Sequence, residues 1–113
     1  MSDLTKKKCV PCEGGIPPLQ GAELTPWLKQ ISSAWELIEG EKKVRREFTF
    51  KDFKATMTFV NKVAELAETE GHHPDIHIFY NKLTLELWTH KINGLFDNDF
   101  ILAAKIDDLY SAS

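Results

Sequence analysis

All four histidines of this chain fall within residues 72–90, and three of them are candidates for one site: His72 and His73 are adjacent, and His90 follows 17 positions later. Imidazole has an unperturbed pKa of about 6.5, so it can donate or accept a proton near neutral pH. Two imidazoles in one cleft can divide the acid and base roles, each worth about 10²–10⁴-fold in rate. No serine or cysteine nucleophile and no phosphate-binding loop accompanies them. The chemistry that fits is an elimination, hydration or isomerisation without a covalent intermediate.

A metal site or helix capping could also account for these histidines. Histidine is the commonest protein ligand of metals; however, adjacent histidines usually point apart, and the i, i+4 pair of helix-borne zinc sites is missing. Capping is favoured by Glu65, Glu68 and Glu70, which crowd the last turn of a predicted helix. The helix dipole disfavours anions there, and protonatable histidines after that turn would relieve the cost. We expect no bound metal.

Apolar periodicity predicts the elements that must position the histidines. The strongest helix covers residues 52–70, with Asp52 as N-cap and with Gly71 and Pro74 ending it. A short helix begins near Thr25-Pro26, and Asp97 is the predicted N-cap of a last helix. Alternating apolar residues over 35–38 and 44–50 predict a hairpin that turns at Gly40, with Arg46 interrupting its apolar face.

A second hairpin is predicted over residues 76–80 and 83–88, with its turn at Asn81-Lys82. The register that puts the apolar side chains on one face places His77 opposite Glu86.

Continued toward the open end of the hairpin, this register brings His73 level with His90. We therefore expect His72, His73 and His90 to share one pocket, with Glu68 on the helix turn above it.

In order, the elements are helix, two strands, helix, two strands, helix. The simplest assembly is an α+β two-layer sandwich, a four-stranded antiparallel sheet with three helices on one face. A chain of 113 residues is one domain by size, so we expect a domain over 19–113 and an N-terminal tail over 1–18. The tail holds Cys9-Val-Pro-Cys12. A lone CxxC could be half of a zinc site or a redox pair, but no second cysteine pair and no following helix support either. A tail that packs on the domain or lies loose is the simpler interpretation.

Composition narrows the class of protein. The net charge of −3, with no basic run beyond Lys6-Lys7-Lys8, disfavours nucleic acid or an acidic membrane as partner. No stretch approaches 18 apolar residues, and the first residues lack the apolar run of a signal peptide. Two cysteines cannot build a disulfide framework. We expect an intracellular, cytoplasmic protein.

A spaced set of residues resembles one known family, the pterin-4a-carbinolamine dehydratases. The set comprises Gly71-His72-His73-Pro74-Asp75, Tyr80-Asn81-Lys82, Thr89-His90, Gly94-Leu95 and Asp99, with Trp35, Glu39-Gly40 and Phe50-Lys51-Asp52-Phe53 upstream. The resemblance covers about residues 20–110. The tail and the last helix resemble the plant-type and bacterial branch more than the animal one.

The resemblance implies a metal-free, cofactor-free dehydration of 4a-hydroxytetrahydropterin to quinonoid dihydropterin, a step of pterin recycling. The family's catalytic histidines fall on His72, His73 and His90. We expect His72 and His90 to carry the acid–base steps and His73 to orient the pterin. Substrate-pocket roles fall on Trp35, Glu68 and Asp99. The resemblance also implies a homodimer or homotetramer.

Some expectations remain divided. Trp35 fits either the core or a flat surface for a planar ligand. Animal members place an acid directly before His-His, whereas this chain has Gly71, so that role passes to Glu68 or Glu70 or is absent. The alternative function is a protein-interaction module, such as the dimerisation cofactors among animal relatives, or a pterin-binding protein with little turnover.

Overall fold

The computed structural model describes residues 3–10 and 14–112. Its helices and strands follow the predicted order: α1 (Thr25–Leu28), β1 (Glu36–Ile38), β2 (Lys43–Thr49), α2 (Phe53–Glu70), β3 (Asp75–Phe79), β4 (Lys82–Leu87) and α3 (Asp97–Ser111). Three short 3-10 turns accompany them: η1 (Asp3–Lys6), η2 (Gly21–Leu24) and η3 (His90–Ile92). In the described part of the chain, no helix is both long and apolar enough to cross a bilayer.

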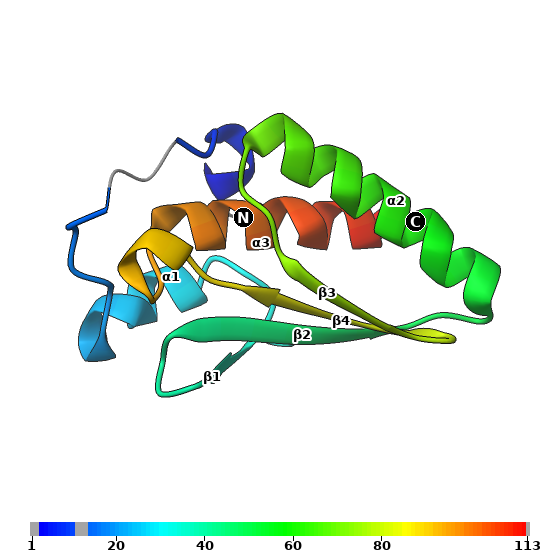
Figure 1. Cartoon of the computed structure of the whole chain (residues 1–113), viewed down its shortest axis with the longest axis horizontal. Helices are drawn as coiled ribbons and strands as arrows, with labels where there is room; N and C mark the ends of the chain where they lie inside the picture. Colours follow the sequence, from blue (N-terminus) through cyan, green and yellow to red (C-terminus); the bar gives the residue numbers. More distant parts are fainter. Residues whose placement is uncertain (1–2, 11–13, 113) are drawn as a thin grey trace.

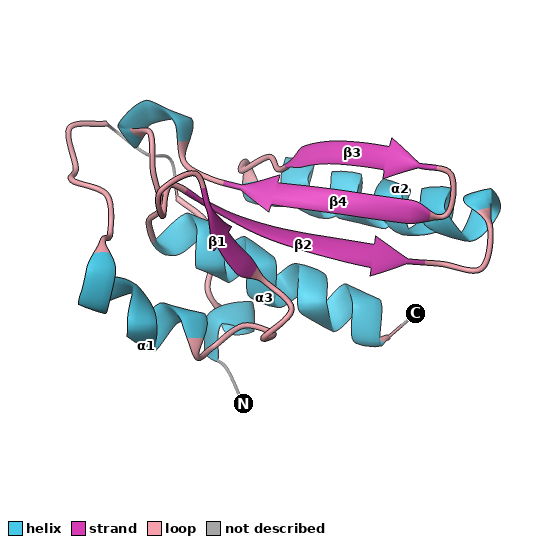
Figure 2. Ribbon diagram, turned by 90° about the horizontal axis from the view of Figure 1, so that it is seen from below, coloured by secondary structure: helices cyan, strands magenta, loops and turns pink. Residues whose placement is uncertain are grey.

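The four strands form one antiparallel sheet in the order β1-β2-β4-β3. The two hairpins are joined along β2 and β4, where Val44 pairs with Leu87 and Phe48 with Leu83. Helices α2 and α3 lie on one side of the sheet (Figure 1), and Figure 2 shows the strands in front of them. The short α1 packs beside α3, with Trp27 stacked on Phe100 at 5.6 Å between ring centroids. The predicted α+β fold is therefore confirmed.

The core lies between the sheet and the two long helices. Alternation along β2 and β4 sends one side chain in two toward α2 and α3. The buried side chains on this face of the sheet are Val44, Phe48, Leu83, Leu85 and Leu87. They belong to one buried cluster that includes, from the helices, Phe59, Val63, Phe100, Leu102 and Ile106.

Arg46 interrupts the apolar face of β2, as predicted, and the structure shows its partner. Its Nη1 forms an ion pair with Asp107 Oδ1 on α3 at 2.5 Å, and both side chains are largely buried. Its guanidinium carbon lies 4.6 Å from the centre of the Phe48 ring. A buried charge is tolerated when it is paired, so Arg46 ties the sheet to α3.

The register predicted for the second hairpin is wrong by two residues. Ile78 pairs with Leu83 and His77 with Thr84, so the turn is Tyr80-Asn81 and not Asn81-Lys82. Tyr80, assigned to a strand by its alternation, has a left-handed φ of 52°.

The physical reason is that side chains alternate with period two along a strand. A shift by two residues keeps each side chain on its own face, so alternation cannot detect it. Contacts with Phe50, the residue that follows β2, accompany the observed turn: Phe50 N donates to Asn81 O at 2.8 Å, and Asn81 Nδ2 donates to Phe50 O at 3.2 Å.

Candidate active site

Helix α2 ends at Glu70, and His72 lies directly after its C-cap, Gly71. Asp52 caps the start of the helix by accepting from Ala55 N, and Gly71 ends it with a left-handed φ of 68°, both as predicted. The N–H groups of Gly71 and His72 donate to the same carbonyl, Ala67 O, at 2.8 and 3.2 Å. This turn gives a carbonyl at the end of the helix its hydrogen-bond donors and changes the direction of the chain.

His72 meets a buried carboxylate. Its Nε2 lies 2.6 Å from Oδ1 of Asp99, on the first turn of α3, and the His72 side chain is 12% exposed while that of Asp99 is 0% exposed. An ionised carboxylate can only accept, so Nε2 carries the proton and Nδ1 is the second nitrogen that can exchange one. A histidine oriented in this way by a carboxylate is the arrangement that general acid–base catalysis requires.

The other oxygen of Asp99 holds two further segments. Its Oδ2 accepts from Thr89 Oγ1 at 2.8 Å and from Phe96 N at 3.0 Å. The sequence predicted Asp97 as the N-cap of α3, but the N-cap is Phe96, and Asp97 is the first helical residue. The third helical residue, Asp99, reaches back to the N-cap N–H, as in a capping box. Capping and contact with His72 are therefore two roles of one carboxylate.

His73 lies at the outer edge of this region. Its Nε2 is 2.6 Å from Glu68 Oε2 on the last turn of α2, and the two side chains are 59% and 78% exposed. An exposed pair of this kind contributes about 0–1 kcal/mol. Glu68 therefore restrains His73 much less than Asp99 restrains His72.

His90 is held by an aromatic ring. It stacks on Trp88 with 4.0 Å between ring centroids and 24° between planes. Trp88 in turn donates from Nε1 to Asp75 Oδ2 at 3.0 Å. Sequence reasoning missed Trp88 and Asp75 as supports of the site. The available signal was the i, i+2 spacing of Trp88 and His90, which places both side chains on one side of an extended segment.

The three histidines lie at the open end of the second hairpin, but each has its own partner. Strand pairing begins at Asp75, and the two-residue shift would set Trp88, rather than His90, level with His73. His72 and His90 are connected through Asp99 and Thr89, the residue before His90. Within residues 3–10 and 14–112, no group of three or more His, Cys, Asp or Glu side chains could hold a metal ion.

Trp35 lies elsewhere. It is 5% exposed, and its Nε1 donates to Asp107 Oδ1 at 2.8 Å. Asp107 is eight residues beyond Asp99 on α3, about 12 Å along the helix at 1.5 Å per residue. The structure therefore groups Trp35 with Arg46 and Asp107 in the core, and brings together His72 with Asp99 and His73 with Glu68.

The first cysteine of the CxxC packs on the domain. Cys9 is 5% exposed, and its Sγ lies 3.6 Å from Asn98 O. Burial, reinforced by the charge of Glu70, raises the pKa of the Cys9 thiol to about 12. A thiol with this pKa is a poor nucleophile and a poor metal ligand at neutral pH. Cys12 lies outside the described residues.

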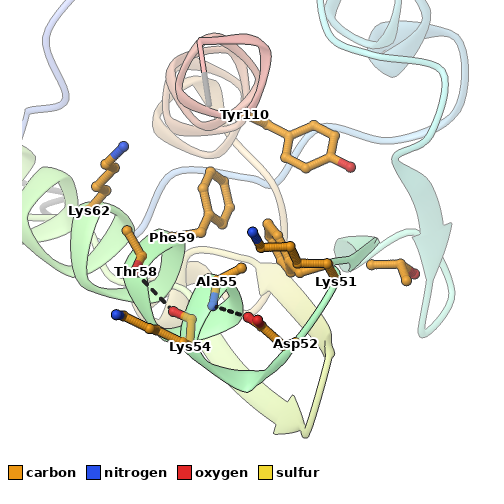
Figure 3. Close-up of a pocket in the computed structure, with 10 residues that line it drawn as sticks. Lys51, Asp52, Lys54, Ala55, Thr58, Phe59, Lys62 and Tyr110 are labelled. Carbon is orange, nitrogen blue, oxygen red and sulfur yellow. Dashed lines mark hydrogen bonds between the residues drawn. The ribbon is translucent and has the colours of Figure 1, made fainter.

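A groove of about 960 Å³ opens at the other end of α2 (Figure 3). Phe50, Phe59 and Tyr110 line it together with Lys51, Lys54 and Lys62. Its lining contains no histidine, and its one carboxylate, Asp52, is engaged in capping α2. Because acid–base groups are gathered at the histidine end, we place the candidate active site there.

Comparisons with known proteins indicate the family of the chain. The family model described as Pterin 4 alpha carbinolamine dehydratase matches residues 17–109. A protein of Rubrobacter xylanophilus, named as a candidate pterin-4-alpha-carbinolamine dehydratase, is 47% identical over 109 residues, which cover 96% of this chain and 100% of that protein. A protein of the same name from Methylococcus capsulatus is 50% identical over 106 residues, covering 94% and 92%.

A solved structure is also similar. It is that of a transcriptional coactivator/pterin dehydratase from Brucella melitensis, and it superposes with a TM-score of 0.75 at 30% identity. The match covers 81% of this chain and 97% of that one. The chain therefore belongs to the pterin 4 alpha carbinolamine dehydratase family.

Proposed function

We propose that this protein is a 4a-hydroxytetrahydropterin dehydratase, a hydro-lyase that acts in pterin recycling without a metal. The observation that supports this most is the 2.6 Å contact between His72 Nε2 and the buried carboxylate of Asp99. It provides an oriented imidazole in a chain of the pterin dehydratase family.

The reaction needs one acid and one base. The acid protonates the departing 4a-hydroxyl, the carbon–oxygen bond breaks and water leaves. The base removes the ring N–H proton, and the electron pair of that bond forms the new carbon–nitrogen double bond. His72 and His90 divide these two proton transfers, because imidazole is the side chain that enzymes use most often as general acid or base.

The remaining residues bind and orient. Asp99 holds His72, and the exposed His73, with Glu68 beside it, contacts the pterin at the edge of the site. Each restraint reduces the motion that must be frozen out before proton transfer, which is a large part of what positioning contributes to rate.

The experiment is an assay that follows loss of the 4a-hydroxypterin with wild type, His72→Ala and His90→Ala. Each variant should lose about 10²–10⁴-fold in rate, because each lacks one proton-transfer group. His77→Ala is the matched control, since His77 is exposed on β3 and pairs with Thr84. A strong chelator should leave the wild-type rate unchanged. Equal rates in all variants, matching the spontaneous reaction, would reject the enzyme proposal.

We also propose that the protein self-associates through β3. This strand is an edge of the sheet, and large apolar side chains are exposed on it and on the turn after it: Ile76, Ile78, Phe79 and Tyr80. An unpaired edge with apolar side chains favours pairing with another chain. The occupant we favour is a second copy, because a two-fold axis would bury the same side chains from both copies.

The alternative is that the chain acts chiefly in protein interaction. The Brucella melitensis protein is named a transcriptional coactivator as well as a pterin dehydratase, and the exposed side chains of β3 would suit such a role. The same assay separates the two functions, because an interaction module would show no rate above the spontaneous reaction.

A further inference from the structure

The N-terminal segment of residues 3–10 precedes the part of the chain that matches the family model, yet it is packed into the domain. Leu4 is 1% exposed and Cys9 is 5% exposed, and both belong to the core cluster. The family model begins at residue 17. In Figure 1 the dark-blue segment lies where α2 ends and α3 begins. We call residues 3–10 the N-terminal strap.

The strap binds the last residue of α2. Cys9 N donates to Glu70 Oε1 at 2.9 Å, and Lys105 Nζ of α3 donates to Glu70 Oε2 at 2.6 Å. The side chains of Glu70 and Lys105 are 6% and 16% exposed. Charge-assisted hydrogen bonds of this kind are short and strong when they are shielded from water. Strap, α2 and α3 therefore meet at one carboxylate.

The strap also binds the first turn of α3. Asn98 uses both ends of its side-chain amide on one strap residue: Oδ1 accepts from Val10 N at 3.0 Å, and Nδ2 donates to Val10 O. The amide thus pairs with the backbone as a neighbouring strand would. Asn98 is 5% exposed, so leaving these groups without hydrogen-bond partners would destabilise the folded state.

The two anchoring residues stand beside the candidate catalytic pair. Glu70 precedes His72 by two residues, and Asn98 directly precedes Asp99. His72 Nε2 and Asp99 Oδ1 must stay 2.6 Å apart although they belong to different elements. We propose that the N-terminal strap fixes this separation, and that Glu70 and Asn98 are positioning residues of the reaction that act through His72 and Asp99.

A strap that only stabilised the fold would give different results from a strap that positions the site. If the strap only stabilises the fold, loss of its contacts lowers the free energy of unfolding but leaves kcat unchanged while the protein is folded. Loss of a positioning contact lowers kcat in the folded protein and weakens the bond between His72 and Asp99. A displacement of about 1 Å can cost up to about 10²-fold in rate.

The test uses the full chain with one change on each side of the contact. Asn98→Ala removes both hydrogen bonds from the helix side. Val10→Pro removes the Val10 N–H from the strap side, and Val10 is 59% exposed, so little packing is lost. Asn81→Ala is the matched control: Asn81 Nδ2 also donates to a distant backbone carbonyl, Phe50 O, at the other end of the hairpin from the histidines.

Two readouts are taken at a temperature where urea titration shows every variant fully folded. One is kcat and KM in the dehydration assay, which rests on the proposed function. The other is the proton NMR resonance of the His72 Nε2–H, which a short bond to a carboxylate shifts downfield and protects from exchange. The second readout does not depend on any activity, so failure of the proposed function and failure of the strap proposal can be told apart.

For Asn98→Ala and Val10→Pro we expect a fall in kcat of about tenfold with KM nearly unchanged, and a His72 resonance that moves upfield or is lost by exchange. Asn81→Ala should retain the wild-type kcat and resonance. Wild-type kcat and resonance in both strap variants would overturn the proposal and leave the strap a stabilising element. If the wild type has no activity, the resonance alone decides between these outcomes.

Discussion

Asp99 brings three separate segments together with one carboxylate. Its partners are His72 after α2, Thr89 after β4 and Phe96 before α3. A fully buried carboxylate is costly unless its oxygens accept hydrogen bonds, and here each donor comes from a different part of the chain. The position of His72 is therefore tied to the same contacts that close this end of the domain.

Replacing Asp99 tests this dependence. In Asp99→Asn one oxygen becomes an NH₂ group that cannot accept, so at least one of the three donors loses its acceptor. We expect kcat to fall by about 10²–10⁴-fold, in the range seen for histidines that lose their orienting carboxylate, and unfolding free energy to fall by about 1–3 kcal/mol. Steady-state kinetics and urea titration measure the two effects.

Asp52→Asn is the control for this change. It is the same acid-to-amide substitution at the far end of α2, and asparagine is also a good N-cap, so both quantities should stay near wild type. An unchanged kcat in Asp99→Asn would show that His72 works without this carboxylate.

Cys9 should be nearly inert to alkylation in the folded protein. With a pKa of about 12 it is almost entirely protonated at pH 8, whereas an unperturbed thiol, with a pKa of about 8.5, is about one quarter thiolate. We expect iodoacetamide to modify Cys9 at least about 10²-fold more slowly in buffer than in urea, measured by peptide mass spectrometry. Equal rates in the two conditions would contradict the burial of this thiol.

Residue spacing identified the histidine region but did not determine all its contacts. The carboxylate pairs of His72 and His73 involve residues that the resemblance had named, Asp99 and Glu68. The contact of His72 with Asp99 spans 27 positions and depends on how α3 docks, which no local pattern encodes. The core position of Trp35 has the same origin, since its partner Asp107 lies 72 positions away.

Among the elements, the end of α2 is joined to the middle of α3 by the buried ion pair of Glu70 and Lys105. Burial by itself would raise the pKa of Glu70, but the hydrogen bonds from Lys105 and Cys9 N and the charge of Lys105 outweigh it, so the pKa lies below its ordinary value. A lowered folded-state pKa contributes stability above the unfolded pKa, and this contribution is lost as pH falls through the folded value.

The free energy of unfolding should therefore fall more steeply below about pH 4.5 in wild type than in Glu70→Gln, which has no proton to bind at this site. Urea midpoints measured between pH 7 and pH 3 give the slopes. Lys105→Met removes the partner that lowers the pKa, so it should also flatten the slope. Identical slopes in wild type and both variants would mean that Glu70 titrates alike in the folded and unfolded chains.

Sequence patterns predicted the elements better than their pairing. The bounds of α2 were predicted correctly from apolar periodicity, the Asp52 N-cap and the helix-ending Gly71, because these signals are local in the sequence. The register of β3 on β4 is set by the Tyr80-Asn81 turn and its contacts with Phe50, which alternation cannot detect. The N-cap of α3 was predicted one residue too late. Aspartate is a common N-cap residue, which favoured Asp97, but the side chain that accepts from the N-cap N–H is that of Asp99.

At the scale of the molecule, the sheet has two unequal edges. β1 has three residues, whereas β3 has five and carries half-exposed Ile76 and Ile78. A short edge is one of the ways in which proteins avoid unwanted pairing. This difference is why the proposed contact between two copies lies on β3.

If two copies pair through β3, Ile78→Lys should give a monomer in sedimentation velocity where wild type is a dimer or larger. The reason is that a two-fold axis would bring two ammonium groups into an apolar contact. Glu36→Lys, a charge change on the other edge of the sheet, should keep the wild-type mass. A wild type that sediments as a monomer up to about 100 μM would leave β3 without a second copy as its partner.

The strand order also determines which strand pairs can form early and which form late during folding. Within each hairpin the strands are joined by short turns, but β2 and β4 pair residues 33 to 43 positions apart, from Thr49 with Lys82 to Val44 with Leu87. Hairpins and helices form within about 10 μs, whereas distant pairings wait on loop closure. Once helical, the 18 residues of α2 span about 27 Å in place of about 60 Å extended. The helicity of α2 should therefore govern the folding rate, because an early helix shortens the loop that the central strand pair must close.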